Sequence, residues 1–247
     1  MLNTATAEAL AAAGVTKRFG GLVAVDNMTF TLAEKEVLGL IGPNGSGKTT
    51  MMNLISGALK PSSGQISVYG HGIAGTGASY VAKRGIARTF QLVRMLPSMS
   101  ALENVAAGGV FGHARRWGKE LDDYAHALLA RVGLPNAAYA PISSLTYIDQ
   151  KRVELARALA SEPKILLLDE WLAGLNPTEL KIGIALIEQL RVEGCTIIIV
   201  EHVMHAIRSL CDRCIVMNSG AKIAEGTPAQ VLADRDVIRA YLGDENA

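Results

Sequence analysis

The chain has 247 residues, a formal net charge of +1 and 49% hydrophobic residues. This length allows one large domain or a domain with a subdomain, and the balanced charge does not favour the basic surface that binds nucleic acid. No apolar run approaches the roughly 20 residues that cross a bilayer, and residues 1–13 lack the basic start and apolar core of a signal peptide. We therefore expect a protein that stays in the cytoplasm and has no nucleic-acid partner.

A glycine-rich loop between a strand and a helix is the strongest feature of the first hundred residues. Two β-rich stretches, 14–19 and 24–32, precede it, and the apolar run Val37–Ile41 leads into it as a third strand. The loop is 42–50, Gly-Pro-Asn-Gly-Ser-Gly-Lys-Thr-Thr, and a helical pattern follows over 50–58. The motif G-x-x-x-x-G-K-[ST] in this strand–loop–helix context indicates a phosphate-binding loop.

The residue types of this loop suit a nucleoside triphosphate. Glycines let successive backbone N–H groups converge on one anion, and the positive end of the following helix dipole points at the same phosphates. Lys48 adds a positive charge for the β- and γ-phosphates, and the Thr49 hydroxyl can ligate Mg²⁺. The loop residues predicted to contact the nucleotide are Asn44, Gly45, Ser46, Gly47, Lys48, Thr49 and Thr50.

The middle of the chain changes from strands to helices. Strands are predicted over 65–69 and 85–91, with a glycine-rich loop over 70–79 between them. From 92 to about 163 the periodicity is helical, without a convincing strand. The helices expected there span 100–107, 120–132 and 149–160. The segment 108–118 is expected to be a surface loop, with a membrane-subunit contact as the alternative.

Strands and helices alternate again after this helical insertion. The pattern predicts strands over 165–169, 195–200 and 214–217 and helices over 178–192 and 202–210. Such alternation argues for an α/β architecture with a parallel sheet. A hairpin at Ser219-Gly220 and a helical tail are expected to close the chain.

The three cysteines are too few for a disulfide framework. Cys211 and Cys214 form a C-x-x-C without a second pair or a thioredoxin-like setting. We interpret it as a helix end that runs into a strand, with a redox or metal role as the minor alternative.

Two strand ends supply acidic and histidine side chains. Asp169 and Glu170 follow four apolar residues, at the strand end where α/β sheets place their ligand sites. Asp169 would hold Mg²⁺ through its water shell, and Glu170 would polarise the attacking water. His202 ends the next strand and should emerge beside Asp169, where it can donate a hydrogen bond to the γ-phosphate. His205, one turn on, is given only a structural role.

These motifs together resemble the ATPase subunits of ABC transporters. The phosphate loop at Lys48, Gln91, the stretch 145–152, the pair Asp169-Glu170 and the pair Glu201-His202 stand in the order and spacing of that family, across essentially the whole chain. The resemblance implies a single ABC ATPase domain over 1–247 with an α/β, P-loop NTPase (RecA-like) core and a parallel sheet. It also implies an N-terminal antiparallel β subdomain. The implied core is 1–91 with 163–247, and the implied helical signature subdomain is 92–162.

The same resemblance implies a dimer with two ATP molecules and Mg²⁺ held between the subunits. Each site takes its phosphate loop from one subunit and its signature from the other, here Thr146, Tyr147, Ile148 and Asp149. Phe19 matches the aromatic residue that stacks on adenine, and Gln91 would contact Mg²⁺ or the water. The implied partners are membrane permease subunits, a sister ATP-binding subunit or a second copy of this chain and, indirectly, a periplasmic binding protein. The implied location is the cytoplasmic face of the inner membrane, as a peripheral subunit.

Three further stretches narrow the resemblance. Arg88-Thr-Phe-Gln91, Ala173-Gly-Leu-Asn-Pro177 and the ending 237–243 look like the ATP-binding subunits of branched-chain amino acid importers. The implied function is ATP hydrolysis that energises import of branched-chain or other hydrophobic amino acids. No residue of this chain is expected to touch the transported molecule, since selection belongs to the membrane and binding-protein partners.

Two positions depart from the family pattern. Ile148 stands where a second glycine would let the helix N-terminus approach the γ-phosphate, and its branched side chain is expected to add bulk beside those amides in the partner's site. Trp171 stands where proline is usual and is expected to bring a large ring beside Glu170. These departures leave two alternatives: accommodation by local repacking, or a nucleotide-binding subunit with impaired hydrolysis. A non-transport ABC ATPase ranks lower, because the chain has neither long coiled coils nor tandem cassettes.

Overall fold

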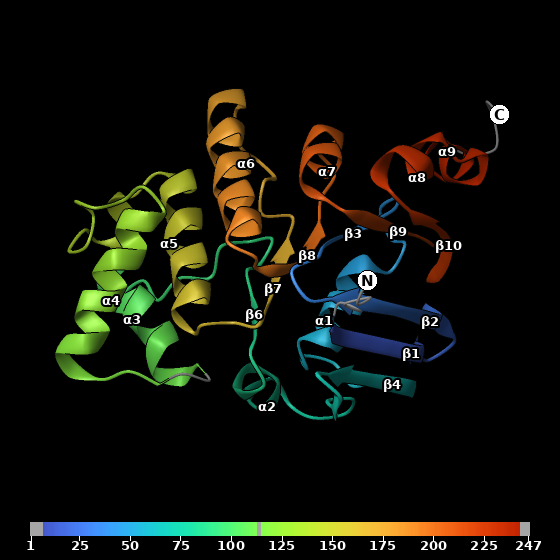
Figure 1. Cartoon of the computed structure of the whole chain (residues 1–247), viewed down its shortest axis with the longest axis horizontal. Coiled ribbons are helices and arrows are strands. Elements are labelled where there is room, and N and C mark those ends of the chain that lie inside the picture. Colours follow the sequence, from blue (N-terminus) through green and yellow to red (C-terminus); the bar gives the residue numbers. More distant parts are fainter. Residues whose placement is uncertain (1–6, 113–114, 243–247) are drawn as a thin grey trace, which may run out of the picture.

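The computed structural model describes residues 7–112 and 115–242, which form two sheets and a separate group of helices (Figure 1). The first sheet is antiparallel and four-stranded, in the order β2-β1-β4-β5. Its strands are β1 (Glu8–Phe19), β2 (Leu22–Ala33), β4 (Ser63–Val68) and β5 (His71–Gly72). β1 starts six residues before the predicted 14–19, because Ala9, Leu10 and Ala12 are buried and extend its inward-facing side. An N-terminal antiparallel β unit is therefore confirmed.

The second sheet has six strands in the order β10-β9-β3-β8-β7-β6. They are β3 (Val37–Ile41), β6 (Ile86–Arg88), β7 (Ile165–Asp169), β8 (Thr196–Val200), β9 (Arg213–Asn218) and β10 (Ala221–Gly226). All neighbours pair in parallel except β10, which returns antiparallel along β9. The predicted parallel sheet and the closing hairpin are confirmed.

The parallel sheet separates two hydrophobic cores, and alternate residues of one strand enter different cores. In β7, Ile165 and Leu167 face the core shared with the antiparallel sheet, whereas Leu166 and Leu168 face the core formed with most of the helices. This period of two explains why the buried strands read as continuous apolar runs: both faces are covered.

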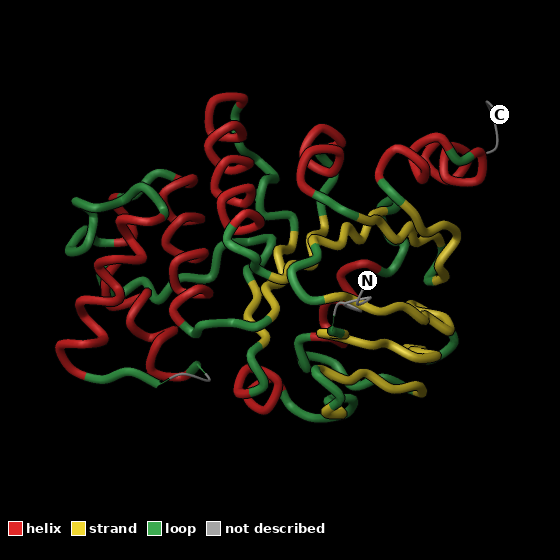
Figure 2. Tube along the Cα trace, in the orientation of Figure 1, coloured by secondary structure: helices red, strands yellow, loops and turns green. Residues whose placement is uncertain are grey.

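The helices divide between these two cores, as Figures 1 and 2 show. Helix α1 (Lys48–Ile55) and α2 (Ala78–Lys83) pack on the side of the antiparallel sheet, through residues such as Met51 and Val81. The opposite core takes the other helices: α3 (Ala101–Phe111), α4 (Gly118–Arg131), α5 (Tyr147–Ala160), α6 (Pro177–Val192), α7 (Met204–Leu210), α8 (Pro228–Ala233) and α9 (Arg235–Leu242). The first three of these form the separate helical group predicted from the sequence, with a short 3₁₀ turn at Ile142–Ser144 ahead of α5.

Two predicted loops are partly wrong. The expected loop 70–79 contains β5 and the start of α2, and the expected loop 108–118 contains the last turn of α3. At Gly108, a Cβ would stand 2.1 Å from the Arg157 carbonyl oxygen of α5. The glycines at 108 and 109 therefore allow close helix packing instead of ending the helix. His113 and Ala114 of that segment lie outside the described residues.

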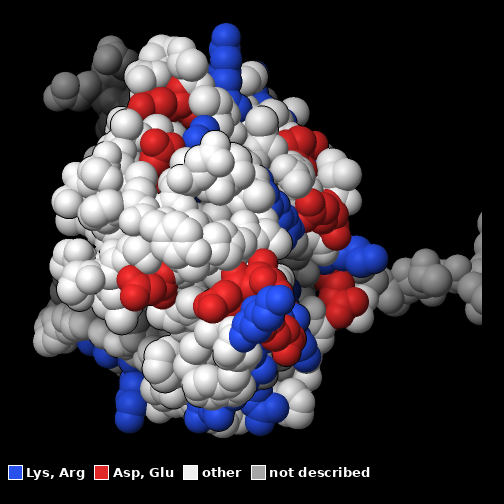
Figure 3. Space-filling model, turned by 90° about the vertical axis from the view of Figure 1, so that its left-hand side faces the viewer, with Lys and Arg blue, Asp and Glu red and all other residues white. Residues whose placement is uncertain are grey.

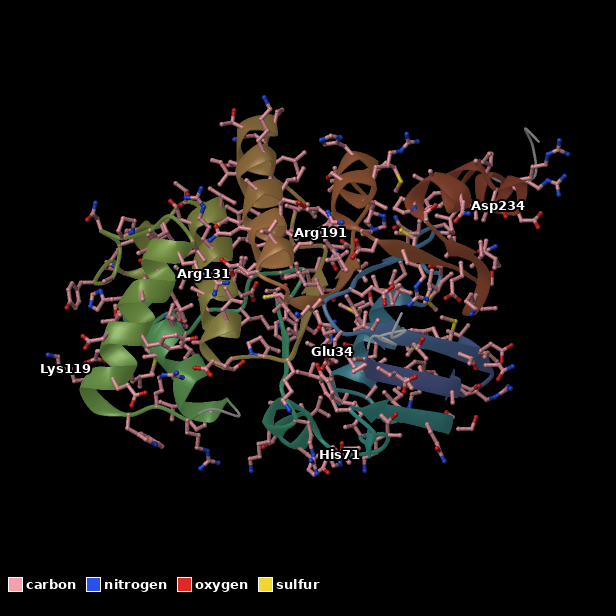
Figure 4. All side chains as sticks on the ribbon, viewed as in Figure 1. Glu34, His71, Lys119, Arg131, Arg191 and Asp234 are labelled. Atoms are coloured by element: carbon pink, nitrogen blue, oxygen red, sulfur yellow. The ribbon has the colours of Figure 1, made fainter. Side chains whose placement is uncertain are left out.

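Ion pairs at the surface connect α4 of the helical group to α6, and α6 to the chain ahead of β9. Arg131 of α4 pairs with Glu193 at the end of α6, and Arg191 of α6 pairs with Asp212 at 2.7 Å; both arginines are labelled in Figure 4. Figure 3, a view onto the helical group, shows basic and acidic side chains interspersed instead of one patch of a single sign. Within the described ranges, no helix is long and apolar enough to span a membrane.

Candidate functional site

A cavity of about 800 Å³ lies where the carboxyl ends of the parallel strands meet the antiparallel sheet. It is lined by Phe19, Leu22, Val23, Ala24, Asn44, Gly45, Ser46, Gly47, Lys48, Thr49, Thr50, Gln91, Glu170, His202, Ser219 and Gly220. The fold thus brings every predicted phosphate-loop residue together with Phe19, Gln91, Glu170 and His202. The rest of the lining comes from segments that lie far from the loop in the sequence.

The glycine-rich loop between β3 and α1 depends on two backbone positions. Gly47 has a φ of 102°, and a Cβ there would stand 2.3 Å from the Ala24 carbonyl oxygen. Gly42 has a φ of 146°, and a Cβ there would stand 2.1 Å from the Met217 carbonyl oxygen. Gly47 also precedes α1 without any side-chain cap, so the first N–H groups of that helix have no protein side chain to satisfy them. This arrangement suits an anion.

Lys48 is buried beneath this loop. Its Nζ donates hydrogen bonds to the carbonyl oxygens of Gly42 and Pro43, each at 2.8 Å. Burial lowers the pKa of Lys48, and the negative charges of Glu170 and Asp169 oppose that shift. The lysine is therefore held by the loop with its charge next to the two carboxylates of β7's end.

Asp169 is the last residue of β7 and is not among the residues that line the cavity. Only one of its two carboxylate oxygens has a hydrogen-bond partner. Its Oδ2 accepts a hydrogen bond from Arg88 Nη2 at 2.5 Å, and both side chains are almost fully buried. Arg88 is in turn bonded to Asn53 and Ser56, through Nη1 at 2.7 and 3.0 Å. Asp169 Oδ1 is buried and has no hydrogen-bond partner. An oxygen left free in this way fits the ligation of a hard cation or of its water shell.

In residues 7–112 and 115–242, no group of three or more His, Cys, Asp or Glu side chains is placed to hold a metal. Mg²⁺ usually keeps several waters and is held by one or two carboxylates plus substrate phosphates, so it does not require such a group. Thr49 and Gln91, the other predicted ligands, line the cavity.

The Glu170 carboxylate lies between Gln91 and His202. Gln91 Nε2 donates a hydrogen bond to Oε2 at 2.6 Å, and His202 Nε2 lies 3.0 Å from Oε1. These three residues come from the ends of β6, β7 and β8, which are neighbours in the sheet. Phe19 lies at another part of the cavity wall, with its side chain about half exposed and Lys17 Nζ 5.0 Å from the centre of its ring.

The four predicted signature residues do not line this cavity. Thr146 caps α5, where its Oγ1 accepts from the Asp149 N–H, and Tyr147 is exposed. The Ile148 side chain is buried, because α5 begins at Tyr147 and places residue 148 on its inner side. This burial argues against the expectation that Ile148 adds bulk beside the open amides of this helix, although that expectation concerned the nucleotide of a partner subunit and stays a prediction.

Trp171 also differs from expectation. Its ring is fully buried in the core between α5 and α6: Nε1 donates to the Lys151 carbonyl oxygen at 3.2 Å, and a ring carbon lies 3.2 Å from where a Cβ on Gly183 would stand. The contacts of the Glu170 carboxylate are with Gln91 and His202 instead. The ring is accommodated because α6 carries glycine at the point of contact.

Two residues of the site were given no role by the sequence reasoning. Arg88 lies on β6 beside Leu167 of β7, which brings it within reach of Asp169. Glu201 is buried directly after β8, and its Oε1 accepts the Leu172 N–H at 2.6 Å. Burial raises the pKa of Glu201 to about 7, against the opposing effects of the Leu172 N–H and the charge of Lys151. An acid that immediately follows an apolar run was the one available signal for it.

Known proteins resemble the chain in sequence and structure. A family model described as ABC transporter matches residues 25–173, and one described as branched-chain amino acid ATP-binding cassette transporter matches 221–247. The chain is 41% identical to the high-affinity branched-chain amino acid transport ATP-binding protein LivG of Salmonella typhimurium, over 95% of this chain and 98% of that protein.

Two solved structures support the same relationship. The ADP conformation of MJ1267, an ATP-binding cassette of an ABC transporter, superposes with a TM-score of 0.87 at 29% identity and covers 96% of this chain and 99% of its own. The ATP-binding cassette MJ0796, in a dimeric post-hydrolysis state with ADP and Pi, gives a TM-score of 0.80 at 28% identity over 89% and 98% of the two chains. The predicted α/β nucleotide-binding fold with its antiparallel subdomain is thereby confirmed.

Proposed function

This chain belongs to the ATP-binding cassettes of ABC transporters, and from that premise we propose that it hydrolyses ATP to energise an importer of branched-chain or other hydrophobic amino acids. The family match and the relatives' names support the transport role. The observation that carries the ATPase assignment is the cavity in which the loop at Lys48 faces Glu170, Gln91 and His202. Nothing in the comparisons supports the alternative of a subunit with impaired hydrolysis.

In the proposed site the loop residues hold the phosphates and Phe19 stacks on adenine. The uncapped N–H groups of α1 and the charge of Lys48 face the phosphates. Thr49, Gln91 and Asp169 would hold Mg²⁺, with Asp169 Oδ1 free for this purpose. When bound, Mg²⁺ neutralises charge on the phosphate oxygens.

Glu170 is the proposed general base. Its carboxylate would accept a hydrogen bond from the attacking water and so orient it towards the γ-phosphate. Gln91 and His202 hold that carboxylate at the cavity wall, and His202 would donate to the γ-phosphate once nucleotide separates it from Glu170. Catalysis here is mainly positioning and charge stabilisation, which is the general logic of phosphoryl transfer.

The proposed working form is a dimer. Thr146, Tyr147, Ile148 and Asp149 lie outside the cavity of their own chain, which agrees with their serving a second subunit's nucleotide. The proposed domain contains a nucleotide-binding core, 1–91 with 163–247, and a signature subdomain, 92–162. We also propose that the chain binds membrane permease subunits, through which a periplasmic binding protein acts. Its proposed location is the cytoplasmic face of the inner membrane.

Hydrolysis and uptake are the two measurements that test this function. The full-length chain should hydrolyse Mg-ATP, and Glu170→Gln should still bind ATP but lose turnover by roughly a thousandfold, because the base is removed while the phosphate loop is intact. Vesicles that carry the assembled transporter should take up labelled leucine with ATP inside, and far less labelled lysine. Equal turnover by Glu170→Gln would remove Glu170 from the base role, and uptake of lysine alone would overturn the substrate class.

A further inference from the structure

The three residues that leave β7, Glu170, Trp171 and Leu172, form a backbone segment that we call the exit segment. Glu170 has a φ of 48°, in the left-handed region that is unfavourable for a residue with a side chain. Such a conformation is strained and persists only where neighbouring structure fixes it. Since the Glu170 carboxylate must meet a water held on a nucleotide, what fixes this backbone also sets the position of the proposed base.

One restraint comes from the end of the adjacent strand. The Leu172 N–H donates to Glu201 Oε1 at 2.6 Å, and Glu201 is 1% exposed. The other oxygen of Glu201 is buried and unpartnered, so this carboxylate serves one backbone group of the exit segment. A bond this short to a buried acceptor fixes where the chain runs two residues after Glu170.

The second restraint comes from α5. The Trp171 Nε1–H donates to the Lys151 carbonyl oxygen at 3.2 Å, entirely within the core. Gly183 of α6 leaves the space for this ring and for Leu172, whose Cδ2 lies 2.6 Å from where a Cβ on Gly183 would stand. The Trp171 side chain is therefore held by α5 on one side and by α6 on the other.

A third contact lies just beyond the exit segment. The Tyr147 ring, in the first turn of α5, lies 3.4 Å from where a Cβ on Gly174 would stand. The path of the chain after Glu170 is therefore set by α5, α6 and the end of β8, where the Glu170 N–H also donates to the Val200 carbonyl oxygen at 2.8 Å. One local turn bond, from the Ala173 N–H to the Glu170 carbonyl oxygen at 3.1 Å, adds to these contacts.

We propose that Trp171 and Glu201 are positioning residues for Glu170: their hydrogen bonds to Lys151 and Leu172 hold the strained exit segment so that the Glu170 carboxylate stays between Gln91 and His202. This inference rests on the proposed role of Glu170. Neither residue touches the nucleotide, so their loss should slow the chemical step without weakening ATP binding. A displacement of the base by about 1 Å is enough to cost on the order of a hundredfold in rate.

Trp171→Phe is the first test, because it removes the Nε1–H and keeps an aromatic ring in the core. We expect kcat for Mg-ATP hydrolysis by the full-length chain to fall about tenfold, with the KM for ATP and the melting temperature close to those of the parent. Trp117→Phe, at a tryptophan that is 63% exposed, is the matched control and should keep the parent kcat. An unchanged kcat in Trp171→Phe, or equal changes in kcat and KM, would overturn the proposal.

A second pair of variants tests Glu201 independently of ring packing. Glu201→Gln keeps an acceptor for the Leu172 N–H and should retain kcat within about twofold, whereas Glu201→Leu removes the acceptor and should lower kcat about tenfold. If both variants lose activity equally, or neither does, Glu201 does not act through this bond.

Combining Trp171→Phe with Glu170→Gln tests whether Trp171 acts through the proposed base. Single-turnover release of labelled phosphate should be no slower in Trp171→Phe/Glu170→Gln than in Glu170→Gln alone, because residues that act as a unit are not additive. A further tenfold loss in the double variant would overturn the inference. If Glu170→Gln itself hydrolyses like the parent, the proposed function of Glu170 fails instead, so the two failures are distinguishable.

Discussion

The phosphate-binding loop and the exit segment lie at the same edge of the parallel sheet, but they obtain their unusual backbone in different ways. The loop uses glycines in the left-handed region, such as Gly45 and Gly47. The exit segment places Glu170 in that region without glycine and is held by Glu201 and by the bond between Trp171 and Lys151. The backbone conformation of the loop depends on its own glycines, whereas that of the exit segment depends on contacts with other elements of the fold.

This difference decides how each region tolerates a departure from the family pattern. A side chain at Gly47 would meet the Ala24 carbonyl oxygen at 2.3 Å, and a carbonyl cannot move out of the way cheaply. The Trp171 ring instead fits into the space beside Gly183, and its Nε1–H donates to a carbonyl oxygen of α5. A substitution in the exit segment can therefore be compensated elsewhere in the fold, whereas one in the loop cannot.

Lys48→Ala should give the largest effect and would sharpen this contrast. The variant removes the loop's buried charge, so we expect the affinity for Mg-ATP to fall roughly a thousandfold, or about 4 kcal/mol. Isothermal titration with ATP measures it, with Lys181→Ala on the exposed side of α6 as control. ATP affinity within threefold of the parent would show that the loop's backbone alone holds the phosphates.

The contrast also explains what could be predicted from the sequence. The phosphate loop, the two strand-end acids and His202 were predictable, because each follows an apolar strand and the strand ends of a parallel sheet meet at one edge. The family resemblance added Phe19 and Gln91, and the structure brings both to the same cavity. The positions of most strands along the chain and the existence of the helical group followed from periodicity.

What the sequence could not show are contacts between distant residues. Arg88 reaches Asp169 across 81 positions, and Glu201 reaches the Leu172 N–H across 29. Neither pairing has a local signal, because it depends on strand order and on which way a buried side chain turns. The extension of α3 through Gly108 was missed for a related reason: glycine served packing against α5, and its local helix-breaking tendency gave the opposite prediction.

Ile148→Ala tests the next largest effect and separates two interpretations of α5. The sequence suggested that Ile148 obstructs a nucleotide, in which case truncation should raise ATPase activity. The structure buries this side chain at 6% exposure, so truncation should instead lower the free energy of unfolding by about 3–4 kcal/mol. Guanidinium unfolding measures it, and Ile182→Ala, at 38% exposure on α6, should lose less than about 1 kcal/mol. Unchanged stability with faster hydrolysis would support obstruction.

Glu201→Gln should give the smallest effect, one that depends on pH. Burial raises the pKa of Glu201 from 4.5 to about 7, so between these values the folded protein keeps a proton that the unfolded chain has released. The stability that this proton supplies is complete below pH 4.5 and is lost as the pH rises to about 7.

A glutamine at 201 cannot ionise and avoids that loss. The variant should therefore match the parent near pH 4.5 and exceed its free energy of unfolding by about 2–3 kcal/mol at pH 8. Urea unfolding at several pH values measures the difference, and Glu8→Gln, at an exposed position of β1, should show no such trend. A parent and variant that stay equal from pH 4.5 to 8 would mean that Glu201 ionises as easily in the folded protein as in the unfolded chain. Its carboxylate would then have to be solvated or paired in the folded protein.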